Sequence, residues 1–79
     1  MDDLFFLCVT RDTVINIDST KIVYFESDGN YTTIMTVNMY KTMVGINLGN
    51  VVEELQRQLG NHSRYFVRVG KRHIVNRHY

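Results

Sequence analysis

The sequence contains only one cysteine among its 79 residues, so no disulfide bond can form within the chain. Cys8 lies in the apolar run Leu4-Phe5-Phe6-Leu7-Cys8-Val9, where we expect it to pack as a small buried hydrophobic side chain. A chain without disulfide bonds suits a reducing compartment, and we therefore expect the protein to be cytoplasmic.

The sequence also lacks a long hydrophobic run. The segment at residues 4–9 is far shorter than the ~20 residues that a helix needs to cross a bilayer. The basic residue that begins a signal peptide is missing before it. We therefore expect neither a membrane span nor a membrane partner.

Motifs of catalysis and of metal or cofactor binding are absent as well. No Gly-x-Ser-x-Gly elbow surrounds a serine, and the five glycines follow no phosphate-binding pattern. The pairs Cys8/His62 and His73/His78 match no established ligand spacing. We therefore expect no catalytic residue, metal ion or cofactor, and we do not expect an enzyme.

Acidic residues are missing from the last third of the chain. Residues 55–79 contain six Arg and Lys and no Asp or Glu, whereas residues 1–54 contain all eight acidic residues and three basic ones. The overall charge of +1 thus hides parts of +6 and −5, and three histidines in the basic part add charge below neutral pH. The asymmetry indicates either a surface that binds a polyanion or a solvated basic edge that binds nothing.

The sequence does contain many short β-branched and aromatic segments. At 44% hydrophobic residues the composition argues against disorder, and the length fits one small domain over residues 1–79. Strands are expected at residues 4–10, 13–17, 21–27, 31–37, 40–44 and 65–69, with Ile74-Val75 returning to the core. The first strand is apolar on both faces and is expected to be buried.

Turns are expected between these strands. Arg11-Asp12 is a polar turn, residues 18–20 form a turn or a single helical turn, and a further turn lies near residues 38–39. Asp28-Gly29-Asn30 is a strong hairpin signal, because glycine accepts a positive φ at little cost. Gly70-Lys71-Arg72 is expected to be a loop, since the glycine interrupts the strand pattern.

One helix interrupts the strands. Its apolar side chains recur at helical spacing: Leu48, Val51, Val52, Leu55 and Leu59. We expect a helix over residues 48–59 that packs on the sheet, with either Asn47 or Asn50 as its N-cap and Gly60 at its end. Glu53 and Glu54 lie on its outer face, so that face is a poor candidate for entering a DNA groove.

Several side chains admit two interpretations. Tyr31 can stack on a base or fill a strand face, and the strand face is the commoner role. His73 suits half-buried packing as well as a phosphate contact, and Asn76 is expected to cap the turn that follows it. The three methionines spaced by four, Met35 to Met43, fall in expected strands and are therefore expected in the core.

Three separated blocks of the chain share the order and spacing of one known family. They are Ile22-Val23-Tyr24-Phe25-Glu26-Ser27-Asp28-Gly29-Asn30-Tyr31, the expected helix, and Phe66-Val67-Arg68-Val69-Gly70-Lys71-Arg72-His73-Ile74-Val75-Asn76. Over residues 4–79 the chain resembles LytTR-type DNA-binding domains, the output domains of many bacterial response regulators. The resemblance implies a mainly β fold with one α-helix, built from small antiparallel β-sheets.

The sequence departs from the family pattern in two respects. Gly70 stands where the family usually has His, and Arg72 where it usually has Ser. The family fold continues with further strands that carry another DNA-contacting loop, whereas this sequence ends at Tyr79. The resemblance therefore implies a C-terminally short form or a sheet completed by another copy, with any phosphorylation control coming from outside these residues.

The resemblance also implies a function. It is sequence-specific binding of double-stranded DNA by a bacterial transcription regulator of a two-component system, with inter-strand loops in the major groove and copies that pair as homodimers. The two loops here are residues 28–32 and 70–72. Together with two arginines of the basic segment, the candidate DNA-binding residues are Lys71, Arg72, Arg68, Asn30, Tyr31, Thr32 and Arg77.

Two alternatives come from other classes of protein. An interaction module would pair a shortened chain with another regulator through an open sheet edge and would bind DNA poorly. Single-stranded RNA binding would use Tyr24, Tyr31 and Tyr40 on a sheet face, but no RNA-recognition aromatic motif accompanies them.

Overall fold

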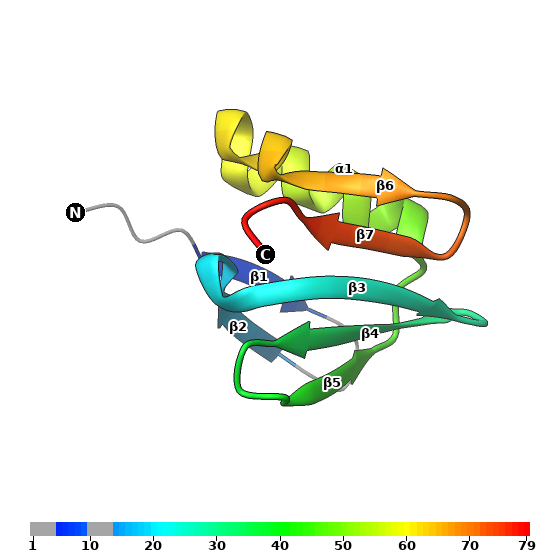
Figure 1. The fold of residues 1–79 in the computed structure, drawn as a ribbon. Coiled ribbons are helices and arrows are strands. Elements are labelled where there is room, and N and C mark those ends of the chain that lie inside the picture. The colour runs from blue at the N-terminus through cyan, green and yellow to red at the C-terminus, as the bar shows by residue number, and fades with distance from the viewer. Residues whose placement is uncertain (1–4, 10–13) are drawn as a thin grey trace.

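A computed structural model describes residues 5–9 and 14–79 (Figure 1). The elements in chain order are β1 (Phe5–Val9), β2 (Val14–Asp18), the 3₁₀ helix η1 (Ser19–Lys21), β3 (Ile22–Asp28), β4 (Tyr31–Thr36), β5 (Lys41–Val44), α1 (Leu48–Leu59), the 3₁₀ helix η2 (Gly60–Tyr65), β6 (Phe66–Val69) and β7 (His73–Asn76). The strands form an antiparallel β1–β2 pair and an antiparallel five-stranded sheet in the order β5-β4-β3-β7-β6. The predicted fold class, mainly β with one helix in small antiparallel sheets, is confirmed.

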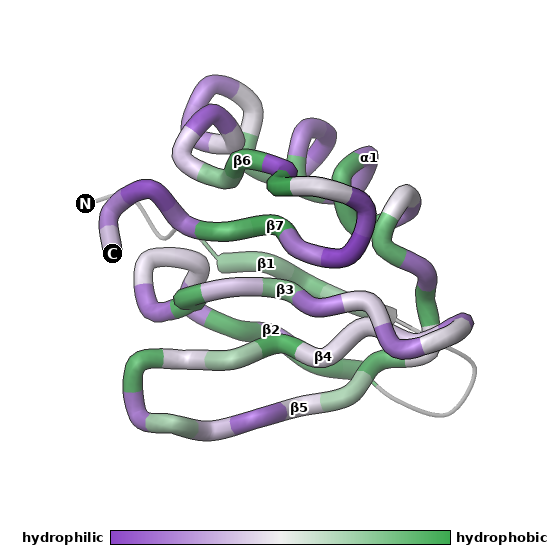
Figure 2. Tube along the Cα trace, turned by 45° about the vertical axis from the view of Figure 1, so that its right-hand side comes forward, coloured by the Kyte–Doolittle hydropathy of each residue, from purple (hydrophilic) through white to green (hydrophobic). Residues whose placement is uncertain are grey.

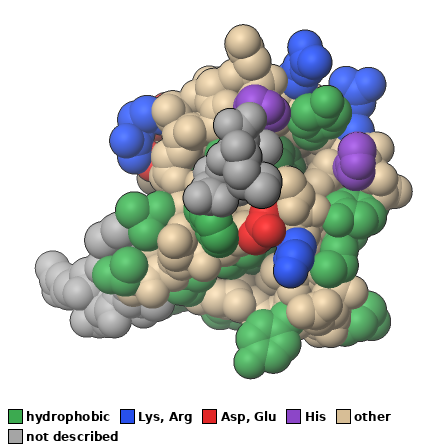
Figure 3. Space-filling view, turned by 90° about the vertical axis from the view of Figure 1, so that its left-hand side faces the viewer, with side chains coloured by type: hydrophobic (Ala, Val, Ile, Leu, Met, Phe, Trp, Pro, Cys, Tyr) green, Lys and Arg blue, Asp and Glu red, His purple; other side chains and the backbone are tan. Residues whose placement is uncertain are grey.

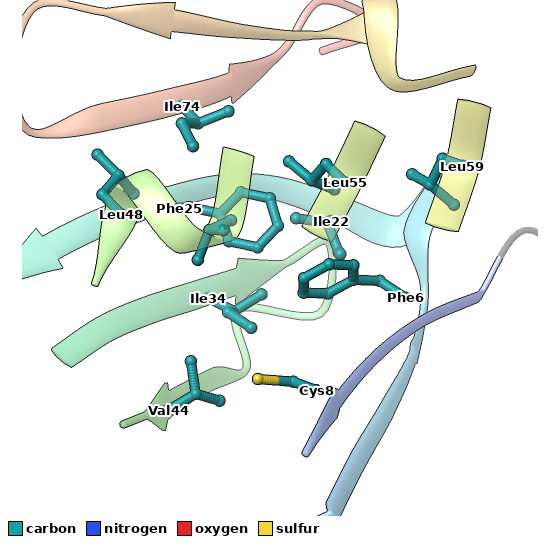
Figure 4. Close-up of a cluster of buried hydrophobic side chains, with 11 residues drawn as sticks. Phe6, Cys8, Ile22, Phe25, Ile34, Val44, Leu48, Leu55, Leu59 and Ile74 are labelled. Carbon is teal, nitrogen blue, oxygen red and sulfur yellow. The ribbon is translucent and has the colours of Figure 1, made fainter. Parts of the chain in front are cut away.

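The core lies between the five-stranded sheet on one side and α1 with β1 on the other (Figure 4). Phe25 of β3 occupies its centre, and the rings of Phe6 and Phe66 each meet it edge to face with centroids 5.7 Å apart. The buried residues of α1 are Leu48, Val51, Leu55 and Leu59, four of the five that the helical spacing predicts. Hydrophobic stretches lie within β1, β2 and β7 and along α1, while the β3–β4 and β6–β7 turns are largely hydrophilic (Figure 2).

The bounds of α1 match the sequence prediction, and its cap resolves the open choice. The Oδ1 atom of Asn47 accepts a hydrogen bond from the Asn50 N–H at 2.9 Å, and Asn47 has an extended backbone outside the helix. Asn47 is therefore the N-cap, and Asn50 lies within the first turn. Gly60 ends the helix with a φ of 58° and donates its N–H to the Gln56 carbonyl, as expected of a glycine at this position.

β1 is buried on one face only, which corrects the expectation of a strand buried on both. Phe6 and Cys8 face the core, whereas Phe5 and Leu7 are exposed. Among the described strands β1 pairs only with β2, and a two-stranded sheet packed on a core has one face turned outward. Burial, with a contribution from Glu54, raises the pKa of the Cys8 thiol, in keeping with its predicted packing role. The expectations for residues 4 and 10–13 lie outside the described residues.

The prediction that the methionines fill the core is wrong for two of them. Met35 is buried, but Met39 is 80% exposed and Met43 is 55% exposed. Met39 lies in the turn between β4 and β5 with a φ of 65°, and Met43 lies on a face of β5 that α1 does not cover. The turn itself was predicted near residues 38–39, and the Thr36 N–H and the Tyr40 carbonyl close it at 3.0 Å.

Candidate nucleic-acid interface

Two turns lie at the same end of the five-stranded sheet. One joins β3 to β4 at Gly29-Asn30, and the other joins β6 to β7 at residues 70–72. Because β3 and β7 are antiparallel neighbours, the end of β3 meets the start of β7 (Figure 1). The Ser27 N–H donates a hydrogen bond to the Arg72 carbonyl at 2.7 Å. This backbone bond fixes the position of one turn relative to the other.

Each turn depends on a glycine with a left-handed backbone. The φ angle is 64° at Gly29 and 65° at Gly70, a conformation that costs an ordinary L-residue energy but costs glycine little. A Cβ atom at either position would meet nothing within 4 Å. The requirement for glycine is therefore one of backbone conformation and not of space, and it sets the direction in which each turn projects.

The β6–β7 turn presents two exposed cations, Lys71 and Arg72. Arg72 Nη2 donates to the Ser27 carbonyl at 3.4 Å, and Arg68 Nη2 donates to the Lys71 carbonyl at 3.1 Å. The turn is thus held from both sides by arginines. Among the described residues, the Lys71 ammonium has no carboxylate within ion-pair distance, so its charge is available to an incoming anion.

The β3–β4 turn presents neutral and acidic groups. Asn30 is exposed at its tip, and Tyr31 is 53% exposed with its ring against Gly45. Thr32, by contrast, is 0% exposed, and its Oγ1 donates to the Ile46 carbonyl at 2.8 Å. The expectation that Thr32 reaches a base edge does not fit this geometry, because strand alternation turns its side chain into the core.

Arg77 lies apart from both turns. It follows the far end of β7, where its N–H donates to the Tyr65 carbonyl at 2.7 Å. The four residues of β7 separate it from Arg72, and five residue steps along an extended chain span about 16 Å. Figure 3 views this opposite end of the molecule, where lysine, arginine and histidine side chains lie mostly in the upper half above scattered hydrophobic ones. The structure therefore brings together Lys71, Arg72, Arg68 and Asn30, but not Arg77.

The sequence reasoning missed the charged groups next to the basic turn. Lys41 of β5 lines a polar cavity of about 310 Å³ together with Glu26, Asp28 and Arg72. His73 Nε2 lies 3.5 Å from the Glu26 carboxylate. Only the pairing of β5, β4, β3 and β7 across the sheet brings these residues together, so no local signal could have found them. Two carboxylates consequently flank the surface that carries the cations.

Asn76 has the structural role that its position predicts. Its Oδ1 accepts from the His78 N–H at 2.9 Å, and its Nδ2 donates to the Ile22 carbonyl at 2.9 Å. The side chain is buried and links β7 to the start of β3. Asn76 is therefore part of the scaffold that holds β7 in place, and it is remote from the turns at the other end of that strand.

Within the described residues, 5–9 and 14–79, no group of three or more His, Cys, Asp or Glu side chains is arranged to hold a metal ion. No helix in these ranges has the length and apolar character needed to cross a bilayer.

The fold and the paired turns define a small β-rich domain. Its surface for an anion is a cationic loop between two strands and not a helix. A family model described as the LytTr DNA-binding domain matches residues 12–79. The chain belongs to the LytTR family of DNA-binding domains. This membership indicates DNA binding by a transcription regulator, and the domain is not a catalytic one. Searches of curated proteins and of solved structures gave no match.

Proposed function

We propose that the protein binds double-stranded DNA in a sequence-specific manner and inserts the β3–β4 and β6–β7 turns into the major groove. The observation that carries this proposal is the 2.7 Å bond from the Ser27 N–H to the Arg72 carbonyl. It makes the two turns one surface, and only the second turn is cationic. A single rigid surface can match the spacing of phosphates and bases without first being ordered.

The side chains of the two turns suit different parts of DNA. Lys71 and Arg72 can neutralise phosphates or contact guanine O6 and N7, and Asn30 can pair with adenine through its amide. Arg68 acts through its hydrogen bond to the Lys71 carbonyl, which fixes the turn. The Tyr31 ring lies beside Gly45, just after β5, and supports the hairpin.

The finer setting of this function follows from family membership. We propose a bacterial, cytoplasmic regulator that works as the output domain of a two-component response regulator, with two copies bound to paired DNA sites. Sedimentation velocity of the protein with a duplex that carries one or two sites tests the pairing. A second copy should join only on the duplex with two sites, and a complex of one copy on both duplexes would contradict pairing.

The experiment that tests DNA binding is fluorescence anisotropy across a salt series. The chain is titrated with a random-sequence duplex and with a pool of genomic upstream fragments. About three neutralised phosphates give a slope of roughly −3 in a plot of log affinity against log salt. Preference for particular fragments over the random duplex shows sequence reading. A folded chain that binds neither at low salt would contradict the proposal and favour the interaction module.

A matched pair of variants separates the site from the general charge. Lys71→Ala and Arg57→Ala each remove one positive charge, but Arg57 lies on the outer face of α1 and pairs with Glu54. Lys71→Ala should lower the salt slope by about 1, as expected for one lost phosphate contact, whereas Arg57→Ala should leave it unchanged. Equal losses in both variants would show that the net charge, and not the turn, attracts DNA.

A further inference from the structure

A groove runs between α1 and β6 on the side of the molecule away from β4 and β5. It has a volume of about 490 Å³. The residues that line it are Val52, Leu55, Gln56, Ser63, Arg64, Phe66, Val67, Arg68 and Ile74. Its floor is apolar, and two arginines stand on its rim. None of these side chains except Arg68 belongs to the proposed DNA surface.

One wall of the groove is an unpaired strand edge. β6 is the last strand of the sheet, and no described strand lies on its outer side. The Tyr65 carbonyl accepts from Arg77, and hydrogen-bonding pairs alternate along antiparallel strands, so the peptide groups of Phe66 and Arg68 point outward. The Phe66 N–H is already bonded to the Ser63 carbonyl. The Phe66 carbonyl and both backbone groups of Arg68 therefore face outward.

The side chains along this edge are those that a paired strand would cover. Val67, which also lines the groove, is 39% exposed, and Val69 is 53% exposed. The unpaired N–H and C=O groups of such an edge can form hydrogen bonds with an added strand, whose side chains would cover these two valines. Proline and bulges, two features that protect a sheet edge, are absent from β6 (Phe-Val-Arg-Val), and the one charged residue in this strand is Arg68.

The charge of the rim indicates the chemistry of the occupant. Arg64 and Arg68 are exposed, and the ion pairs found among the described residues involve neither of them. The Arg64 guanidinium lies 5.7 Å from the Tyr65 ring, and Arg68 reaches only a backbone carbonyl. Carboxylates on an incoming strand would give both arginines charge-assisted partners.

We propose that the β6 edge and the adjoining groove bind an extended acidic segment of a partner protein, which adds a strand to the sheet. An apolar side chain of the segment covers Val52 and Phe66, which are half-buried in the groove, and its acidic side chains contact Arg64 and Arg68. Strand addition takes affinity from backbone bonds and specificity from alternate side chains. The apolar floor favours a peptide over DNA, since a phosphate backbone gains nothing from burial against it. This interaction goes beyond DNA binding and does not depend on it.

The probe for this proposal is a fluorescein-labelled peptide of sequence Ser-Val-Glu-Val-Leu-Val-Glu-Ser. Strand alternation places its Glu-Leu-Glu side chains on one face, toward the groove, and its valines on the other. Fluorescence anisotropy with the whole chain measures its affinity. Replacement of both Glu by Lys, or N-methylation of alternate backbone amides, should each weaken binding by about tenfold or more, because each removes charge-assisted or backbone hydrogen bonds.

Variants of the chain complete the test. Arg64→Glu should weaken peptide binding by about tenfold or more, whereas Arg57→Glu, the same charge change outside the groove, should not. Circular dichroism melting confirms that both variants fold. Equal binding of the acidic, basic and N-methylated peptides would overturn the proposal, as would an Arg64→Glu variant that binds like the parent. Displacement of the peptide by a random-sequence duplex would also overturn it and assign the groove to the DNA surface.

Discussion

The β3–β4 and β6–β7 turns share a backbone conformation but differ in charge. Each contains a glycine with a φ near 65°, 64° at Gly29 and 65° at Gly70, and one backbone bond joins them at 2.7 Å. Asp28 precedes the first glycine, whereas Lys71 and Arg72 follow the second. The shared geometry places both turns on one surface, and the difference in charge would suit them to different tasks in the proposed DNA binding.

This difference separates affinity from selectivity. Phosphate contacts position a protein on DNA, and base contacts specify the sequence. Under the proposed function the cationic turn would supply the attraction, since positive charge and counterion release dominate affinity. The acidic turn cannot attract phosphate, so under the proposed function its contribution would be discrimination through Asn30 and repulsion of a misplaced backbone by Asp28. Substitutions in the two turns should therefore have different effects on DNA affinity and on sequence preference. A substitution in the scaffold should affect both turns equally.

The largest effect is expected in the scaffold that both turns share. Leu55 is buried where α1 packs on the sheet, and Leu55→Ala should cost about 2–5 kcal/mol of unfolding free energy. In a chain of this size that loss can abolish folding and both turns with it. Urea denaturation measures the cost, with exposed Gln56→Ala as the control. A Leu55→Ala variant that unfolds at the same urea concentration as the parent would show that this face of α1 is not buried.

The next effect is specific to the cationic turn. Lys71→Ala and Arg72→Ala should each weaken DNA binding by about 1–3 kcal/mol if they contact bases, with smaller, sequence-independent losses if they contact phosphate. Arg72 is already bonded to the Ser27 carbonyl and lies beside two carboxylates, so Lys71→Ala should lose more. Anisotropy with preferred and random duplexes distinguishes the two cases. Unchanged affinity in both variants would remove this turn from the site.

The scaffold was more predictable from sequence than the site. The bounds of α1 and the hairpin at Gly29 came from local signals, namely apolar spacing and turn chemistry. The burial of Thr32 and the position of Lys41 beside Arg72 depend on which strands are neighbours and in what register, and a one-residue shift would exchange the faces. The sequence suggested that Arg77 belongs with Arg72, because only five positions separate them. The extended strand β7 lies between the two and places Arg77 at the other end of the sheet.

Replacing the two glycines tests whether their shared backbone matters equally. Gly29→Ala and Gly70→Ala should each cost about 1 kcal/mol of stability, because both positions have a left-handed φ and a Cβ disfavours it. Thermal unfolding measures this cost. Gly70→Ala should also weaken DNA binding, since it redirects the cations, whereas Gly29→Ala should mainly reduce preference between duplexes. Equal binding losses for both variants would mean that the turns do not divide their tasks as proposed.

The smallest effect has the opposite sign. Asp28→Asn removes a carboxylate beside Arg72 with almost no change of shape, so it should strengthen DNA binding by about 0.5 kcal/mol, roughly twofold, as expected for exposed charges several ångströms apart in water. The gain should shrink as salt rises, because screening weakens the repulsion that Asp28 exerts on phosphate. Glu53→Gln makes the same charge change on the outer face of α1, away from both turns, and should leave affinity nearly unchanged. Competition anisotropy of the two variants at low and high salt resolves a twofold difference. Equal strengthening by both variants would assign the effect to net charge. A gain confined to Asp28→Asn, together with a weaker preference between duplexes, would show that Asp28 increases selectivity. It would also show that Asp28 lowers the affinity that the cationic turn provides.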